Sequence, residues 1–82
     1  MTPDEIVFGG LYRGRRPTYD FFGEVQNDRA VIFIDRLTGT VQYDSYAVKN
    51  GRHYPSTTVE AFAKWAKLRI NEDGTPYTEN AA

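Results

Sequence analysis

Three arginines between two tyrosines form the segment of this sequence best suited to chemistry at a surface. The segment reads YRGRRPTY and runs from Tyr12 to Tyr19. A guanidinium binds phosphate in a bidentate manner and stacks on bases, and a tyrosine ring offers a second stacking face. The pattern indicates a loop that binds an anionic partner, with nucleic acid as the first candidate. The predicted contact residues are Tyr12, Arg13, Arg15, Arg16 and Tyr19.

A second basic turn follows later in the chain, at KNGRH, residues 49–53. Asn-Gly favours a type I′ turn because both residues tolerate positive φ, so a hairpin is expected here. Its returning strand would be His53–Tyr54, ended by Pro55. Lys49, Arg52 and His53 complete the predicted binding surface.

The distribution of charge agrees with an anionic partner. The net charge is −1, yet all ten Lys and Arg lie within residues 11–70, together with six acids, so this part carries +4. The remaining acids lie near the two ends of the chain. A basic body with acidic flanks indicates an anionic partner, and an ordinary solvated surface is the alternative.

The same residue types also fit a protein partner, since Tyr and Arg are common hot-spot residues of protein interfaces. The alternative function is therefore a small modulator or inhibitor that acts on a larger protein complex. An open sheet edge near Ile6–Phe8 is another surface for such a protein partner, and homodimerisation through an edge strand is a further alternative. A solvated loop whose tyrosines fold back into the core is the non-functional one.

Catalysis and metal binding are not indicated. The single histidine, His53, is near Ser56 in sequence and could face Asp44 across a hairpin, but no nucleophile-elbow motif accompanies them. One histidine without any cysteine cannot supply the usual zinc ligands. We therefore expect a protein that is not an enzyme and holds no cofactor or metal.

The elements that must position the binding loop are short strands. The chain has 82 residues, which suits a single domain. Strands are expected at Ile6–Tyr12 and Tyr19–Val25, with a turn at Asn27-Asp28, and at Ala30–Asp35, which is apolar on both faces and therefore central. If the turn Arg36–Gly39 has four residues, Ile34 faces Val41 and Ile32 faces Tyr43. With three residues and a bulge, Phe33 faces Tyr43 instead.

One amphipathic helix is expected at about residues 57–70. Thr57 and Glu60 have the spacing of a capping box, and Val59, Phe62, Ala63, Ala66 and Ile70 form an apolar stripe. Trp65 lies at the margin of this stripe, as a core residue or a partly exposed anchor. Residues 1–5 are expected to be frayed and residues 71–82 to be a disordered acidic tail, which leaves 6–70 as the domain.

These elements predict an α+β fold that is mostly β, a small antiparallel meander or SH3-like barrel of about five strands with a C-terminal helix. Short strands around the Asn27-Asp28 and Thr38-Gly39 turns, with a long basic loop after the first strand, resemble a small SH3-like barrel. The outline of residues 6–70 is also similar to small accessory proteins of bacteriophages. That resemblance implies a binding module, and it assigns no functional residue.

The composition also bears on location. Acidic residues stand at Asp4 and Glu5, where a secretory signal would be basic, so no signal peptide is expected. Apolar runs are far shorter than the ~20 residues that cross a bilayer, so no membrane partner is expected. The absence of cysteine fits a soluble protein of the reducing cytoplasm.

Overall fold

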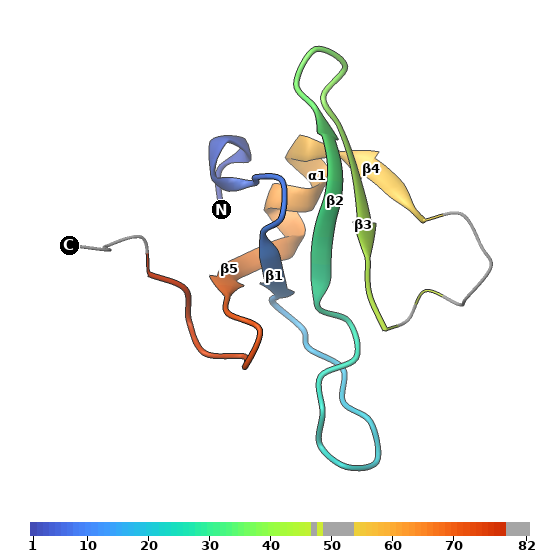
Figure 1. The fold of residues 1–82 in the computed structure, drawn as a ribbon, viewed down its shortest axis with the longest axis vertical. Coiled ribbons are helices and arrows are strands. Elements are labelled where there is room, and N and C mark those ends of the chain that lie inside the picture. The colour runs from blue at the N-terminus through green and yellow to red at the C-terminus, as the bar shows by residue number, and fades with distance from the viewer. Residues whose placement is uncertain (47, 49–53, 79–82) are drawn as a thin grey trace.

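The computed structural model describes residues 1–46, 48 and 54–78. Five antiparallel strands form one sheet in the order β4-β3-β2-β1-β5 (Figure 1). The strands are β1 Leu11–Gly14, β2 Arg29–Asp35, β3 Thr40–Asp44, β4 Ser56–Thr58 and β5 Ala66–Ile70. The predicted mostly β fold with one α-helix is confirmed for the described residues. The sheet is open, with β4 and β5 at its two edges.

The hairpin of β2 and β3 is the centre of the sheet, as the apolar run in β2 predicted. Ile34 pairs with Val41 across a four-residue turn that has Gly39 at a φ of 69°. The second expected pair is wrong, because a bulge between Val31 and Phe33 shifts the register and places Val31 opposite Tyr43. Bulges of this kind insert one unpaired residue, which sequence alternation does not reveal.

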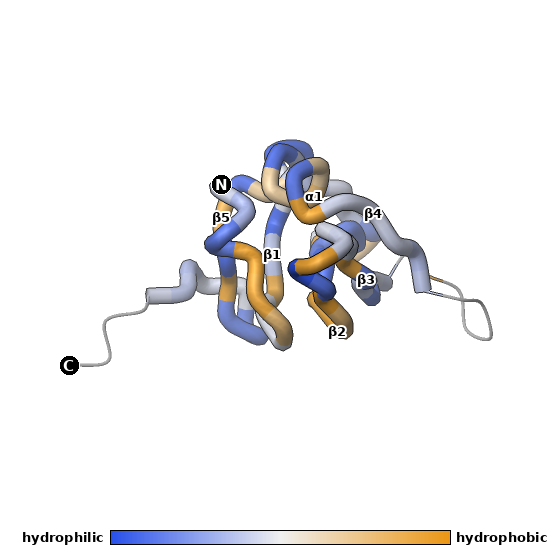
Figure 2. Tube along the Cα trace, turned by 90° about the horizontal axis from the view of Figure 1, so that it is seen from above, coloured by the Kyte–Doolittle hydropathy of each residue, from blue (hydrophilic) through white to orange (hydrophobic). Residues whose placement is uncertain are grey.

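The helix α1, Val59–Trp65, crosses one face of the sheet and connects its two edge strands (Figures 1 and 2). It begins two residues after the predicted start at 57, because Thr58 is the capping residue and its hydroxyl accepts the Ala61 amide at 3.0 Å. Thr57 instead lies in β4 and pairs with Val41. The strand β4 thus begins after Pro55, at the point where the expected strand His53–Tyr54 would end. The predicted capping box of Thr57 and Glu60 is therefore wrong.

The helix also ends earlier than predicted, at Trp65 instead of Ile70. Residues 66–70 form β5, in which Ile70 pairs with Leu11 and Arg69 with Tyr12. Pairing with β1 satisfies the backbone and overrides the helical periodicity of the sequence. Only the first part of the predicted apolar stripe is helical.

The core lies between α1 and the sheet. Its residues are Ile6, Tyr12, Val31, Val41, Val59, Phe62, Ala63 and Ala66. Phe62 is fully buried, and its ring meets those of Tyr12, Tyr43 and Trp65 edge-on at centroid distances of 5.5, 5.7 and 5.3 Å. The aromatic content of the sequence is used here to build a core without disulfides.

Hydrogen bonds join both ends of the described chain to the rest of the fold. Residues Pro3–Glu5 form a 3-10 turn, η1, in which the Glu5 carboxylate accepts the Thr2 amide at 2.9 Å. The Arg36 guanidinium donates to the carbonyl of Pro3 at 2.9 Å and also to that of Ile6. After β5, residues 71–78 turn back, and the Tyr77 amide donates to the Arg69 carbonyl at 3.0 Å. The fraying of residues 1–5 and the disorder of residues 71–82 stay predictions.

The expected open edge strand near Ile6–Phe8 is also wrong. Strand β1 begins only at Leu11 and lies inside the sheet between β2 and β5. Before it, the Gly9 amide donates to the Val31 carbonyl, which extends the contact with β2. Homodimerisation through an edge strand stays a prediction.

Candidate functional site

The long connection from β1 to β2 is a hairpin that projects beyond the end of the sheet (Figure 1). Tyr19 and Val25 form an isolated bridge, and the Gln26 amide donates to the Thr18 carbonyl at 2.7 Å. The predicted strand Tyr19–Val25 and the turn at Asn27-Asp28 are therefore wrong. The turn lies instead at residues 20–24, with Gly23 at a φ of 82°.

Asp20 organises the tip of this hairpin. Its carboxylate accepts the backbone amides of Phe22 and Glu24, both at 2.8 Å, and the side-chain amide of Gln26 at 3.3 Å. An aspartate that captures amides two and four residues ahead favours a turn over a strand. The tip is thus held in one conformation by bonds that do not depend on the core.

Two phenylalanines stand at this tip in water. Phe21 is 96% exposed and Phe22 is 85% exposed, and their rings meet edge-on with centroids 5.5 Å apart. Tyr19, also exposed, lies near them in the same hairpin, and Arg15 and Arg16 are exposed where the hairpin leaves β1. We call residues 15–22 the aromatic loop. It brings together three of the predicted contact residues with two that sequence reasoning missed.

The two phenylalanines were missed because they were assigned to the expected strand Tyr19–Val25. The signal that could have found them is Asp20 followed by Gly23, a polar residue and a glycine bracketing two aromatics. Such bracketing is typical of a turn, and a turn leaves its side chains in solvent.

Two predicted contact residues do not belong to this surface. Tyr12 is completely buried, and its hydroxyl donates to the Glu5 carbonyl at 2.7 Å and accepts the Val7 amide at 2.9 Å. Arg13 forms a bidentate ion pair with Asp28, with nitrogen–oxygen distances of 3.0 and 2.9 Å. This pair ties β1 to the base of the hairpin and raises the pKa of Arg13.

The buried hydroxyl of Tyr12 predicts an alkaline weakening of the fold. Burial raises the pKa of Tyr12 above its ordinary value of 10.0. A pKa raised in the folded state contributes stability below about pH 10, and this contribution is lost as the pH rises through the folded-state pKa. Tyr12→Phe removes this pH dependence. It also leaves the Val7 amide and the Glu5 carbonyl without the hydroxyl, which should lower the free energy of unfolding by about 1–3 kcal/mol at neutral pH.

Urea unfolding of both proteins between about pH 8 and about pH 11 measures this difference. We expect the gap in the free energy of unfolding to narrow above about pH 10. A gap that stays constant over this range would contradict the role of Tyr12.

Lys49, Arg52 and His53 lie outside the described residues, as does the predicted Asn50-Gly51 turn. Their proposed part in binding stays a prediction. Within the described part of the chain, no group of three His, Asp or Glu side chains is placed to hold a metal ion. None of the helices described there is long and apolar enough to span a membrane.

Trp65 is a partly buried residue at the open end of the core. Its ring lies against Phe62 and also carries the Arg29 guanidinium 4.0 Å from its centroid. Arg29 lies over Tyr43 as well, at 4.3 Å, and burial lowers its pKa. The arginine is stacked between aromatic rings and closes this end of the core, so it is not a free contact for a ligand.

The aromatic loop is the arrangement on this molecule that best fits recognition of another molecule. It combines exposed aromatic rings with two arginines that form no ion pair within the described residues. Comparison of the chain with protein-family models, curated proteins and solved structures found no match.

Proposed function

We propose that this protein is a non-enzymatic binding module whose aromatic loop contacts single-stranded nucleic acid. The observation that carries the proposal is the pair Phe21 and Phe22, almost fully exposed at the tip of a hydrogen-bonded hairpin. Leaving two large apolar rings in water gives up the roughly 1.5–3 kcal/mol that burying each of them would contribute. A partner that covers the rings recovers this free energy.

Single-stranded nucleic acid suits both parts of the loop. Its unpaired bases stack on aromatic rings without regard to sequence, and arginines at the base of the same loop supply positive charge for phosphates further along the strand. Arg15 joins the base of the loop to the end of α1. Its backbone amide donates to the Trp65 carbonyl, and its Nε atom donates to the Lys64 carbonyl at 3.4 Å. The exposed Lys64 at the end of α1 therefore adds a third cation to the base of the loop.

Two paired substitutions test this function. Phe21→Ala with Phe22→Ala removes stacking worth about 1–3 kcal/mol per base, so oligonucleotide affinity should fall roughly tenfold or more. Arg15→Ala with Arg16→Ala removes two phosphate contacts and should flatten the slope of log K against log salt by about 1.4. Fluorescence anisotropy of a labelled single strand, titrated at several salt concentrations, measures both quantities.

Leu37→Ala is the matched control, because Leu37 is 99% exposed at the tip of the other hairpin, between β2 and β3. It should bind the oligonucleotide as the parent protein does. If the parent protein binds no single strand at low salt, or if the phenylalanine variants bind as tightly as the parent, the proposal is wrong.

A protein partner is the second candidate, because exposed phenylalanines are also anchors that fill pockets in protein interfaces. Pull-down before and after nuclease treatment separates the two. A protein retained after nuclease and lost with Phe21→Ala and Phe22→Ala favours a modulator of a larger complex. A partner that leaves with the nucleic acid favours the first function.

The proposal includes an SH3-like barrel as the scaffold. Its support is an antiparallel meander whose first strand pairs with its last, Leu11 opposite Ile70, so that α1 returns the chain to its beginning. Cytoplasmic location is proposed as well, and the absence of cysteine supports it.

A further inference from the structure

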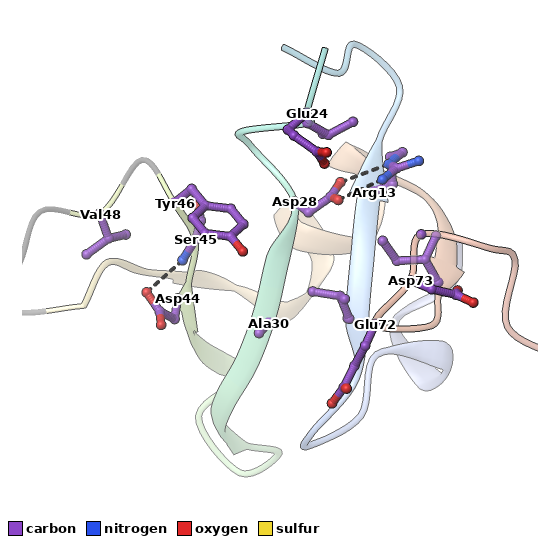
Figure 3. A pocket seen from close by; sticks show the side chains of 14 residues that line it. Arg13, Glu24, Asp28, Ala30, Asp44, Ser45, Tyr46, Val48, Glu72 and Asp73 are labelled. Atoms are coloured by element: carbon purple, nitrogen blue, oxygen red, sulfur yellow. Dashed lines mark hydrogen bonds and ion pairs between the residues drawn. The ribbon is translucent and has the colours of Figure 1, made fainter. Parts of the chain in front are cut away.

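The face of the sheet opposite α1 carries a groove of about 620 Å³. Leu11, Ala30 and Ile70 contribute apolar lining from three neighbouring strands, and Figure 3 shows Ala30 in the middle. Ile70 is buried although it does not belong to the core cluster under α1. A volume of this size lies within the roughly 300–1,000 Å³ of ligand sites, so the groove can accept large apolar side chains.

Carboxylates stand on opposite sides of this groove. Asp44 lies on one side and Glu72 and Asp73 on the other (Figure 3), and Glu24 adds a fourth. The remaining charged pair in the lining, Arg13 with Asp28, neutralises itself and is the only ion pair among the described residues. A molecule that fills this groove must therefore offer apolar surface together with positive charge.

The chain itself presents such a ligand. The hairpin of the aromatic loop carries two exposed phenylalanines at its tip and two exposed arginines where it leaves β1. The tip of the β2–β3 hairpin exposes Leu37, but the neighbouring Arg36 is already bonded to the carbonyls of Pro3 and Ile6. Of these two apolar tips, the aromatic loop is the one that matches the acidic groove.

We propose that the aromatic loop of one molecule docks in the acidic groove of a second copy. A loop cannot enter its own groove, because Glu24 and Asp28 of the same hairpin line the groove while the tip with the phenylalanines extends beyond the sheet (Figure 1). The interface is therefore heterologous, joining two different surfaces of identical chains. Contacts of this type build a ring where the rotation closes and an open row of subunits where it does not.

This association goes beyond nucleic-acid binding and does not rest on it. Both use the aromatic loop, so one loop serves one partner at a time. Only association needs the groove, and this difference allows the two proposals to fail separately.

The test uses two variants that each lack one half of the contact. Phe21→Ser with Phe22→Ser removes the loop anchors and leaves the groove intact. Glu24→Lys with Glu72→Lys reverses the groove charge and leaves the phenylalanines intact, and neither carboxylate accepts a hydrogen bond in the described structure. Sedimentation velocity at low salt, with protein up to about 1 mM, gives the masses.

The average mass of the parent protein should rise with its concentration. Each variant alone should associate only at a protein concentration at least roughly tenfold higher than the parent needs. An equimolar mixture of the two variants holds one intact loop and one intact groove, so it should form a 1:1 dimer that grows no further. Glu60→Lys, on the exposed side of α1, is the charge control and should associate as the parent does.

A parent protein that stays monomeric over this range overturns the proposal, and so does a mixture that forms no dimer. Variants that associate as the parent does also overturn it. Glu24→Lys with Glu72→Lys should keep or strengthen oligonucleotide binding, because it adds positive charge and leaves the phenylalanines in place. A parent protein that associates but binds no oligonucleotide would contradict the proposed function and leave the association standing.

Discussion

Phe62→Ala is expected to lower the free energy of unfolding by about 3–5 kcal/mol. The Phe62 ring is fully buried and meets the rings of Tyr12, Tyr43 and Trp65. Its removal leaves a cavity at the point where α1 meets the sheet, and small domains have only about 5–15 kcal/mol of stability in total. Chemical denaturation followed by tryptophan fluorescence measures the loss, since Trp65 is the only tryptophan and lies 5.3 Å from the ring of Phe62.

Phe62→Leu keeps most of the buried volume and should cost considerably less, which separates cavity formation from a general effect of substitution. Leu37→Ala, at a fully solvated position, should leave stability within about 0.5 kcal/mol. A loss below about 1 kcal/mol for Phe62→Ala would show that the core is not centred on this ring.

Gly14→Ala has the second largest expected effect. A Cβ at position 14 would lie 2.6 Å from the Cε2 and Nε1 atoms of Trp65. The indole ring has little freedom to retreat, because it lies against Phe62 and carries the Arg29 guanidinium. We expect overpacking to cost about 1–3 kcal/mol.

A double-mutant cycle identifies the clash as the cause. Trp65→Leu removes the ring, so adding Gly14→Ala to it should cost much less than Gly14→Ala costs in the parent protein. Equal costs in both backgrounds would mean that the alanine acts on the backbone and not on the tryptophan. The same chemical denaturation, followed by circular dichroism, serves all four proteins.

The centre of the fold could be predicted from the sequence because local and tertiary preferences agree there. The apolar run 31–34 is a central strand, and a four-residue turn pairs Ile34 with Val41 as one of the two predicted registers requires. The helix was predicted in the correct place but too long. Residues 66–70 have helical periodicity, and only the distant partner β1 makes them a strand.

The candidate site could be predicted only in part. Arg15, Arg16 and Tyr19 are exposed as expected. Tyr12 was predicted to lie on the surface, but it is buried and its hydroxyl bonds the backbone of Glu5 and Val7. The acidic groove was not predicted at all. In the sequence Glu72 and Asp73 read as a polar tail, and only the return of residues 71–78 toward β5 brings them to the groove that Asp44 and Glu24 also line.

The edges of the sheet determine how this protein behaves in a crowded solution. The outer strand β4 has only three residues, and beyond β5 the bridge between Ile70 and Pro76 and the bond from Tyr77 to Arg69 occupy backbone groups that would otherwise be free. Short or covered edges offer little template for the addition of foreign strands, which is the usual route from a small sheet to amyloid. The edge strands β4 and β5 are therefore poor sites for the addition of another strand, even when the protein is concentrated.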